Sequence, residues 1–284
     1  MRIWWTWLYE RFGIGRNGMT VSGEFFPAAE RVMYERSPLM SVICQVRYPS
    51  ILRIDSDVPA DFQDRVRDIF PLFERSSDAL AQQIPAEVLR MLGNTGGPAN
   101  YTFKTADGSS LITLSSDSMS VSTTAYDCWE EFAALFGPAL VAFADIYKPA
   151  FYSRVGLRYL NLIRRSPLGL GDVPWRELIA PPILGELNSP FWEENAVDAR
   201  RVIRCVSPDG ENAFLLQHGF ATEGDDPEQG YLIDFDFYTD NHAGAPDADA
   251  ILGRFHERTG SAFHWCISEA LHQAMGPSRL GGNG

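Results

Sequence analysis

The chain has 284 residues, of which 45% are hydrophobic and 21% charged, as in an ordinary globular protein with room for a full core. Its net charge of −13 disfavours nucleic acid as a partner, because no basic run is longer than the arginine pairs at 164–165 and 200–201. Lysine chemistry is also disfavoured, since neither Lys104 nor Lys148 has the neighbours of a Schiff-base or phosphate-loop lysine.

The beginning of the chain is rich in tryptophan but lacks the features of a targeting segment. Glu10 and Arg11 end its apolar run early, and no small-residue cleavage site follows. Since Met19 opens a more conventional start, we interpret residues 1–18 as an N-terminal extension from an over-extended translation start. The alternative is a peptide that docks on a partner or a membrane surface. No stretch approaches the roughly 20 apolar residues of a membrane span, and we expect a cytoplasmic protein.

The first half of the chain predicts strands and two amphipathic helices. Apolar alternation and turn residues predict strands over 41–48, 100–105, 111–115 and 118–124. Helical spacing predicts a helix that starts near residue 58 and ends before Pro71, and a helical turn over 86–93. A longer helix follows Asp127, its expected N-cap, and we expect Pro138 to kink or split it.

A strand over 154–163 ends the first half, and a Pro- and Gly-rich connection with one short helix over 175–179 follows it. The second half then repeats the order of elements. Strands are then predicted over 200–207, 214–222 and 231–239, before a final helix over 249–275. Each half is a pseudo-repeat of three antiparallel strands and a long helix. We therefore predict an α+β fold in which long helices pack one or two antiparallel sheets, with 19–165 and 166–284 as halves of one compact unit.

The strand over 154–163 carries the first candidate binding residues. Period-two alternation places Arg154 and Arg158 on one face, about 13 Å apart, so a small anion would meet one of them but not both. Asn161 falls on the apolar face of the same strand, and Arg47 lies on the outward face of the first predicted strand. These four are our candidate binding residues. The alternative is a solvated or ion-paired sheet face.

Candidate catalytic residues lie on the last two predicted strands. Asp234 and Asp236 share one face roughly 7 Å apart, close enough to hold a divalent ion or to divide acid and base roles. No third ligand stands at a telling spacing, and pairing with arginines of neighbouring strands is the alternative. His218 lies on an apolar face, either as a general base or as a hydrogen-bonded core histidine. Arg158 completes this candidate set.

The final helix and the cysteines give weaker signals. Arg258 and His264, followed by Glu269 and His272, have a spacing found in helical ribonucleases, but the acidic balance opposes RNA. We place both histidines on the helix surface or against the sheet. The cysteines lack paired spacing and lie in apolar segments, so we expect buried reduced thiols, no metal ion and no cofactor. They are Cys44, Cys128, Cys205 and Cys266.

Several segments together resemble a sporadically distributed bacterial family of uncharacterised proteins. Its motifs are a P-L-x-x-V-x-x-x-x-R-[FY] strand, an FQ-x-x-[IV]-R helix, a Y-x-x-W-x-x-F helix start, an R-[IV]-GLRY-[IL]-N strand, a [RQ]-HG turn and a YLLD-x-D strand. The resemblance runs from about Pro38 to Met275. The residues in the motif positions are Pro38, Arg47, Phe62, Gln63, Arg67, Tyr126, Trp129, Phe132, Arg154, Gly156, Leu157, Arg158, Tyr159, Asn161, His218, Gly219, Asp234 and Asp236.

The resemblance implies no known activity. The scattered occurrence of the family is similar to that of genes on mobile or defence-related islands, which implies a partner-dependent accessory role. We therefore expect a non-enzymatic binding protein, antitoxin-like or regulatory, with a protein partner encoded nearby. The acidic surface suits a basic partner. The alternative is a hydrolase or nuclease, which requires His218, Asp234, Asp236 and Arg158 to meet unpaired in one pocket.

Overall fold

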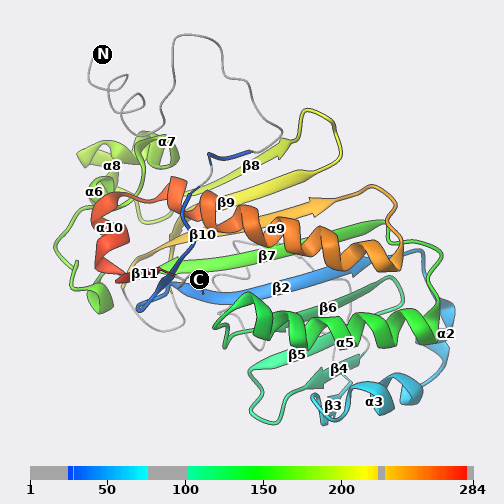
Figure 1. Ribbon diagram of the computed structural model, residues 1–284. Helices are drawn as coiled ribbons and strands as arrows, with labels where there is room; N and C mark the ends of the chain where they lie inside the picture. Colours follow the sequence, from blue (N-terminus) through cyan, green and yellow to red (C-terminus); the bar gives the residue numbers. More distant parts are fainter. Residues whose placement is uncertain (1–24, 28, 76–100, 223–227, 280–284) are drawn as a thin grey trace.

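A nine-stranded antiparallel sheet forms the body of the molecule (Figure 1). The computed structural model describes residues 25–27, 29–75, 101–222 and 228–279. Within them the strand order is β3-β4-β5-β6-β2-β7-β10-β9-β8, which confirms the predicted α+β fold. The strands are β2 (Leu39–Arg47), β3 (Leu72–Glu74), β4 (Tyr101–Lys104), β5 (Ser110–Leu114), β6 (Ser118–Thr123), β7 (Arg154–Ile163), β8 (Arg200–Val206), β9 (Ala213–Ala221) and β10 (Gly230–Thr239).

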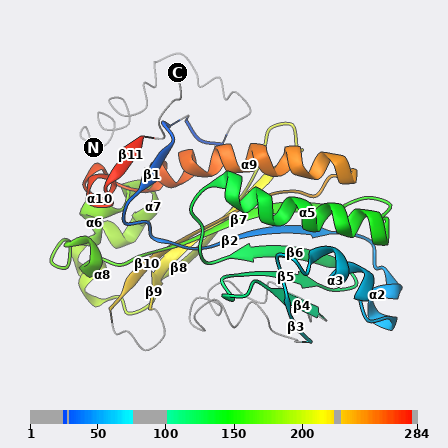
Figure 2. The same ribbon diagram turned by 60° about the horizontal axis from the view of Figure 1, so that its bottom comes forward.

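Two long helices, α5 (Trp129–Tyr147) and α9 (Ala245–Cys266), lie side by side on one face of this sheet (Figures 1 and 2). Helix α9 packs over β7 and β10, and α5 packs over β6 and the shorter helix α3. The remaining helices gather at the two ends of the sheet. They are α2 (Leu52–Ser56), α3 (Ala60–Val66), η2 (Ser166–Leu168), α6 (Trp175–Leu178), α7 (Pro181–Leu184), η3 (Gly185–Asn188), α8 (Pro190–Asn195) and α10 (Glu269–Ala274).

Side-chain alternation divides each strand between two faces. On β2, Val42, Cys44 and Val46 belong to the main apolar core beneath the helices, while Ile43 belongs to a smaller cluster on the opposite face. The same alternation on β7 sends its odd-numbered residues to the core. Each large apolar side chain buried there stabilises the fold by about 1.5–3 kcal/mol. The alternation therefore determines which polar residues lie on the face of the sheet away from α5 and α9. We call this face the polar face.

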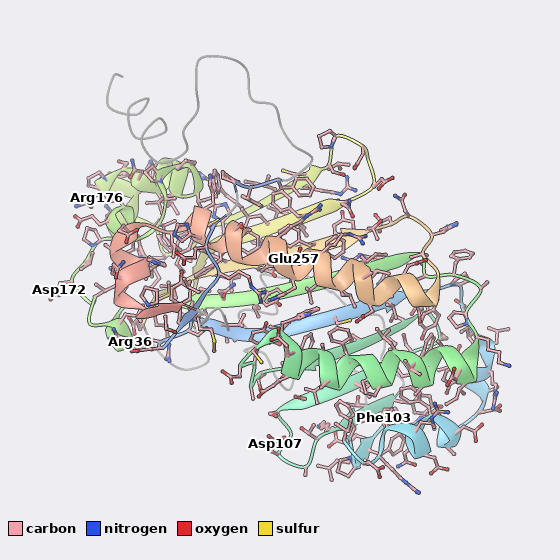
Figure 3. The ribbon with its side chains drawn as sticks, viewed as in Figure 1. Arg36, Phe103, Asp107, Asp172, Arg176 and Glu257 are labelled. Carbon is pink, nitrogen blue, oxygen red and sulfur yellow. The ribbon has the colours of Figure 1, made fainter. Side chains whose placement is uncertain are left out.

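The two ends of the sheet are covered differently (Figure 3). Phe103 of β4 lies at one end, where its ring packs 5.3 Å from that of Phe62 on α3. Arg176 marks the other end, where α6, α7, η3 and α8 form a cluster of short helices. Prolines begin several of these helices, since a proline at the first turn loses no intrahelical hydrogen bond. The second end contains the pocket described below.

The two ends of the described chain meet in a separate small sheet. Strand β1 (Val32–Tyr34) pairs antiparallel with β11 (Pro277–Arg279). Between β1 and the sheet edge, Phe25 and Phe26 pack on Phe214 of β9, with ring centroids 4.8 and 5.1 Å apart. The chain before residue 38, for which the sequence predicted no element, thus contains a short strand.

Most predicted elements are present, and several details of the predictions were wrong. The strand over 154–163 has the predicted ends, and Pro138 lies inside an unbroken α5. The N-cap of α5 is Cys128, not Asp127, and its side chain makes no capping bond. The helix predicted up to Pro71 ends at Val66, and the chain continues into β3. The connection after β7 holds four short helices besides the predicted one.

The predicted final helix over 249–275 is two helices. Ile267 is extended and pairs with Ile179 in an isolated bridge, which stops α9 at Cys266. Ser268 then caps α10, because its hydroxyl accepts a hydrogen bond from the Leu271 N–H. All four cysteines are free thiols. Cys44 and Cys266 are buried as expected, whereas Cys128 and Cys205 are half-buried. The predicted helical turn over 86–93 and extension over 1–18 lie outside the described residues.

The predicted boundary after residue 165 places strands β2 to β7 in the first half and β8, β9 and β10 in the second. The sheet runs without a break across this boundary through the β7–β10 pairing, so both halves belong to it. The predicted pseudo-repeat, in which each half has three antiparallel strands and a long helix, stays a prediction.

Gly219 of β9 is the position where the backbone tolerates no side chain. Its φ is +148°, and an added Cβ would collide with the carbonyl oxygen of Ala199 just before β8. We predict that Gly219→Ala lowers the free energy of unfolding by about 2 kcal/mol or more, measured by urea denaturation.

Gly137 is the matched control for this substitution. It lies in α5 with no atom within 4 Å of an added Cβ. Gly137→Ala should raise the free energy of unfolding by about 0.5–1 kcal/mol, since alanine favours a helix. Equal effects of the two substitutions would contradict the close approach at Gly219.

Candidate functional site

A buried ion pair joins the two central strands of the candidate site. The Arg158 guanidinium of β7 donates from Nε to Asp234 Oδ1 at 2.8 Å and from Nη2 to Oδ2 at 2.7 Å. Both side chains are buried, Asp234 completely. Burial raises the pKa of the Asp234 carboxyl above its usual value, and the Arg158 guanidinium opposes that rise. The bidentate geometry satisfies the carboxylate, so neither group is available to a substrate.

The neighbouring charges on the polar face are paired as well. Arg154 donates to Asp236 at 2.7 Å and lies over the Tyr238 ring at 4.5 Å. Its guanidinium occupies the space beside Gly156, where a Cβ would collide with it. The missing side chain at Gly156 thus allows Arg154 to lie along the sheet. These arginine–aspartate pairs are the alternative that the sequence offered to a binding or catalytic role for the same residues.

The Asp234 carboxylate also receives a hydrogen bond from β9. Gln217 Nε2 donates to Asp234 Oδ2 at 3.3 Å, and Arg200 of β8 donates to Gln217 Oε1 at 2.8 Å. One polar chain therefore crosses β7, β10, β9 and β8. Such a chain fixes the register of four strands, because its members must face one another.

The other two candidate binding residues lie apart from this chain. Asn161 is on the core face of β7 and donates to the Ile233 carbonyl at 3.2 Å, which makes it a buried strand-linking residue. Arg47 lies directly opposite Arg154 in the β2–β7 register, and its Nε is buried without a hydrogen-bond partner. The structure does not bring the four candidates together at one point.

His218 lies on the opposite face from the two aspartates. Its register partner on β10 is Ile233, while that of Gln217 is Asp234, so consecutive residues of β9 serve different faces. His218 is 1% exposed, its Nδ1 lies 2.9 Å from the Tyr231 hydroxyl, and its Nε2 has no partner within the described residues. Burial, with a smaller effect of Arg201, lowers the pKa of His218 to about 4. The ring is therefore neutral at neutral pH.

A pocket of about 550 Å³ lies beside His218, between the short helices and the start of β8. Arg201 pairs with His218 across β8 and β9 and forms an ion pair with Glu186 of η3. Its guanidinium also donates to the Ile183 carbonyl at 3.3 Å. The pocket lining consists of Glu186, Leu187, Trp192, Asn195, Ala196, Val197, Asp198, Ala199, Arg200, Arg201, His218, Gly219 and Tyr231.

Sequence reasoning named His218 and Gly219 but missed Arg201, Glu186 and Tyr231. The residue types gave no signal, because an arginine in a short strand and a glutamate in a loop are common on any surface. Knowing that Arg201 faces His218 requires the β8–β9 register, which neither strand specifies alone. The pocket forms only where these separate segments come together in the folded chain.

The charged residues of the terminal helices do not form a catalytic cluster. His272 Nδ1 lies 2.8 Å from the Tyr34 hydroxyl of β1, and the His264 and His272 rings are 5.1 Å apart. These contacts attach β1 to α9 and α10. Over the described ranges, no group of three or more histidine, cysteine, aspartate or glutamate side chains could hold a metal ion. In the same ranges no helix is long and apolar enough to cross a membrane.

Comparison with protein-family models, with curated proteins and with solved structures finds no match for this chain.

Removing one partner of the buried pair should destabilise the fold strongly. We predict that Asp234→Asn lowers the free energy of unfolding by about 3–5 kcal/mol, because Arg158 stays buried without its countercharge. The double variant Arg158→Met with Asp234→Leu should recover most of this loss, measured by urea denaturation.

Asp145→Asn is the matched control, since Asp145 forms an exposed pair with Arg65 at 2.9 Å. Its effect should stay below about 1 kcal/mol. Similar losses in the two Asp→Asn variants would show that burial does not set the strength of the Arg158–Asp234 interaction.

The buried histidines should make stability depend on pH. Desolvation lowers the pKa of the buried His218 and of the half-buried His256 to about 4, so the unfolded chain binds protons that the folded chain does not. This contribution is complete above pH 6.5 and is lost as pH falls toward 4. His218→Phe should remove up to about 3 kcal/mol of that loss, measured as the unfolding free energy against pH.

His242→Phe serves as the control because it removes a histidine from an exposed position. A slope between pH 6.5 and 4 that stays the same in His218→Phe would contradict a neutral buried His218.

Proposed function

We propose that this chain is a non-enzymatic binding protein whose partner is another protein, bound along strand β8 and helix α8. The observation that carries the proposal is the set of exposed apolar side chains on these two elements and on the short connection between them. We call it the β8–α8 surface. Its members are Phe191, Trp192, Val197, Val202, Ile203 and Val206.

Strand β8 has the properties of a strand that accepts another strand. Within the described residues it pairs with β9 alone and ends the nine-stranded sheet. It exposes apolar side chains on both of its faces, with Val202 53% and Ile203 42% exposed. Protein edges are usually protected by charge, short length or a covering segment, so a long edge with apolar residues on both faces favours strand addition.

Helix α8 extends this surface beyond the strand. The exposed rings of Phe191 and Trp192 pack edge to face on each other, with centroids 5.1 Å apart. Trp192 and Arg201 line the same pocket, so the helix and the start of β8 are neighbours. Aromatic side chains beside an open edge supply large contact area at low entropic cost, which supports a protein as the occupant.

Two features of the charge distribution indicate which charges the partner carries. The arginines of β8, Arg200 and Arg204 among them, would face carboxylates on an added strand. The net charge of −13 would attract a partner that is basic as a whole and would speed its association at low salt. We propose from the family resemblance that this partner is encoded nearby in a mobile or defence-type locus, and that the complex is cytoplasmic.

The positions of the candidate catalytic side chains do not support the hydrolase or nuclease hypothesis. It required four unpaired side chains in one pocket, whereas Arg158 and Asp234 bind each other and His218 lies on the other face. Paired carboxylates and a neutral, deeply buried imidazole give no support to acid–base chemistry at this point of the sheet.

Two Val→Lys variants test the proposal. Val202→Lys alters the β8–α8 surface, and Val141→Lys alters a position on α5 that is 57% exposed. Tagged wild-type and variant proteins would be isolated from the native host and their bound proteins compared by quantitative mass spectrometry. We expect Val202→Lys to lose its specific partner by roughly thirtyfold, the effect of a central interface residue. Val141→Lys should retain it.

Circular dichroism would establish that both variants are folded. Retention of the same partner by Val202→Lys, or equal loss in both variants, would contradict binding at the β8–α8 surface.

A further inference from the structure

The pocket beside His218 contains a buried hydrogen-bond donor that nothing in the described chain satisfies. His218 Nε2 is buried without a partner, although the ring lines a pocket of about 550 Å³. Buried polar atoms in native proteins nearly always have a partner from the protein, from water or from a ligand. The orphaned nitrogen is compatible with a bound group at this pocket, and because Nε2 is closed to solvent, such a group reaches it only when a side chain of the pocket lining moves aside.

The hydrogen-bond network determines which kind of group fits. The Tyr231 hydroxyl contacts Nδ1 of His218 at 2.9 Å and has no other acceptor within the described residues. In the tautomer that the site requires, this hydroxyl donates its proton to Nδ1. The neutral imidazole then carries its own proton on Nε2. The pocket thus presents an N–H donor, and its ligand must supply an acceptor.

Arg201 adds positive charge next to this donor. Its register partner is His218, and side chains paired this way across two strands lie about 5 Å apart at Cβ. The guanidinium already holds a carboxylate, that of Glu186, whose side chain is 64% exposed. An exposed ion pair is weak, so a carboxylate that also bonds to His218 could replace Glu186 on Arg201.

The remaining walls are largely apolar. Leu187, Trp192, Ala196, Val197 and Ala199 line the pocket around these two donors, and the polar side chains of Asn195, Asp198 and Arg200 also reach the lining. An inorganic anion would leave this apolar lining without contacts, and a divalent cation would meet Arg201. A pocket of this volume with few convergent polar groups is typical of sites for small organic molecules.

We propose that this pocket binds a small organic carboxylate with an apolar body, held between His218 Nε2–H and the Arg201 guanidinium. The ligand carboxylate takes the place of Glu186, and its apolar body contacts Trp192. The proposal is independent of the partner protein, although Trp192 and Val197 belong to both the pocket and the β8–α8 surface.

Benzoate is the probe for this site, and benzyl alcohol is its neutral control of similar size. The full-length protein, labelled with nitrogen-15 in its histidine rings, would be titrated and followed by nuclear magnetic resonance. We expect benzoate to shift the His218 ring signals to saturation, with a dissociation constant on the order of 1 mM for so small a ligand. Benzyl alcohol should leave these signals in place at the same concentrations.

Three variants connect the shift to the proposed contacts. Benzoate affinity, measured by calorimetry, should fall by about tenfold or more in His218→Phe and in Arg201→Met, since each loses a charge-assisted or buried hydrogen bond. Glu186→Gln should tighten benzoate binding about threefold, because it removes a competing carboxylate of the strength of an exposed ion pair. A gain of affinity cannot arise from misfolding.

Val202→Lys separates this proposal from the protein-binding function. It should leave benzoate affinity unchanged whether or not it loses the partner protein. Equal binding of benzoate and benzyl alcohol, no shift at His218, or weaker benzoate binding in Glu186→Gln would each overturn the carboxylate site.

Discussion

The bidentate bond between Arg158 and Asp234 is the constraint on which the arrangement of the sheet depends. It lies on the polar face at the junction of β7 and β10, with Gln217 and Arg200 extending it to the edge strand. A slip of one residue in β7 or β10 would move a charged group into the apolar core. The pair therefore contributes more to the choice of register than to net stability, as expected for a desolvated ion pair.

That register also produces the pocket. Gln217 and His218 are consecutive, so fixing Gln217 on the polar face places His218 on the other face, beside Tyr231 and opposite Arg201. Gly219 completes the arrangement, because its bare Cα lets the chain before β8 approach β9 closely. The two proposed activities, protein binding along β8 and carboxylate binding beside it, thus rest on one set of strand pairings.

Much of the fold could be predicted from the sequence, because strands with clear alternation and helices with a wide apolar stripe carry local signals. The strand over 154–163 and the faces of β2 are examples. Short elements such as β3 and α7 could not, since a few residues gain their stability from neighbours alone. The arginine–aspartate pairs were foreseen as one alternative. The pocket was not, because Arg201, Glu186 and His218 come from separate segments, and no local pattern encodes their meeting.

The pairing of β1 with β11 has a consequence for how the chain folds. Ser278 donates to the carbonyl of Met33, a contact between residues 245 positions apart, so this small sheet closes a loop that contains the entire large sheet. Contacts of such long sequence separation form slowly, after hairpins and helices have shortened the distance between their ends. We therefore expect the β1–β11 pairing to form late in folding, after the large sheet that it encloses.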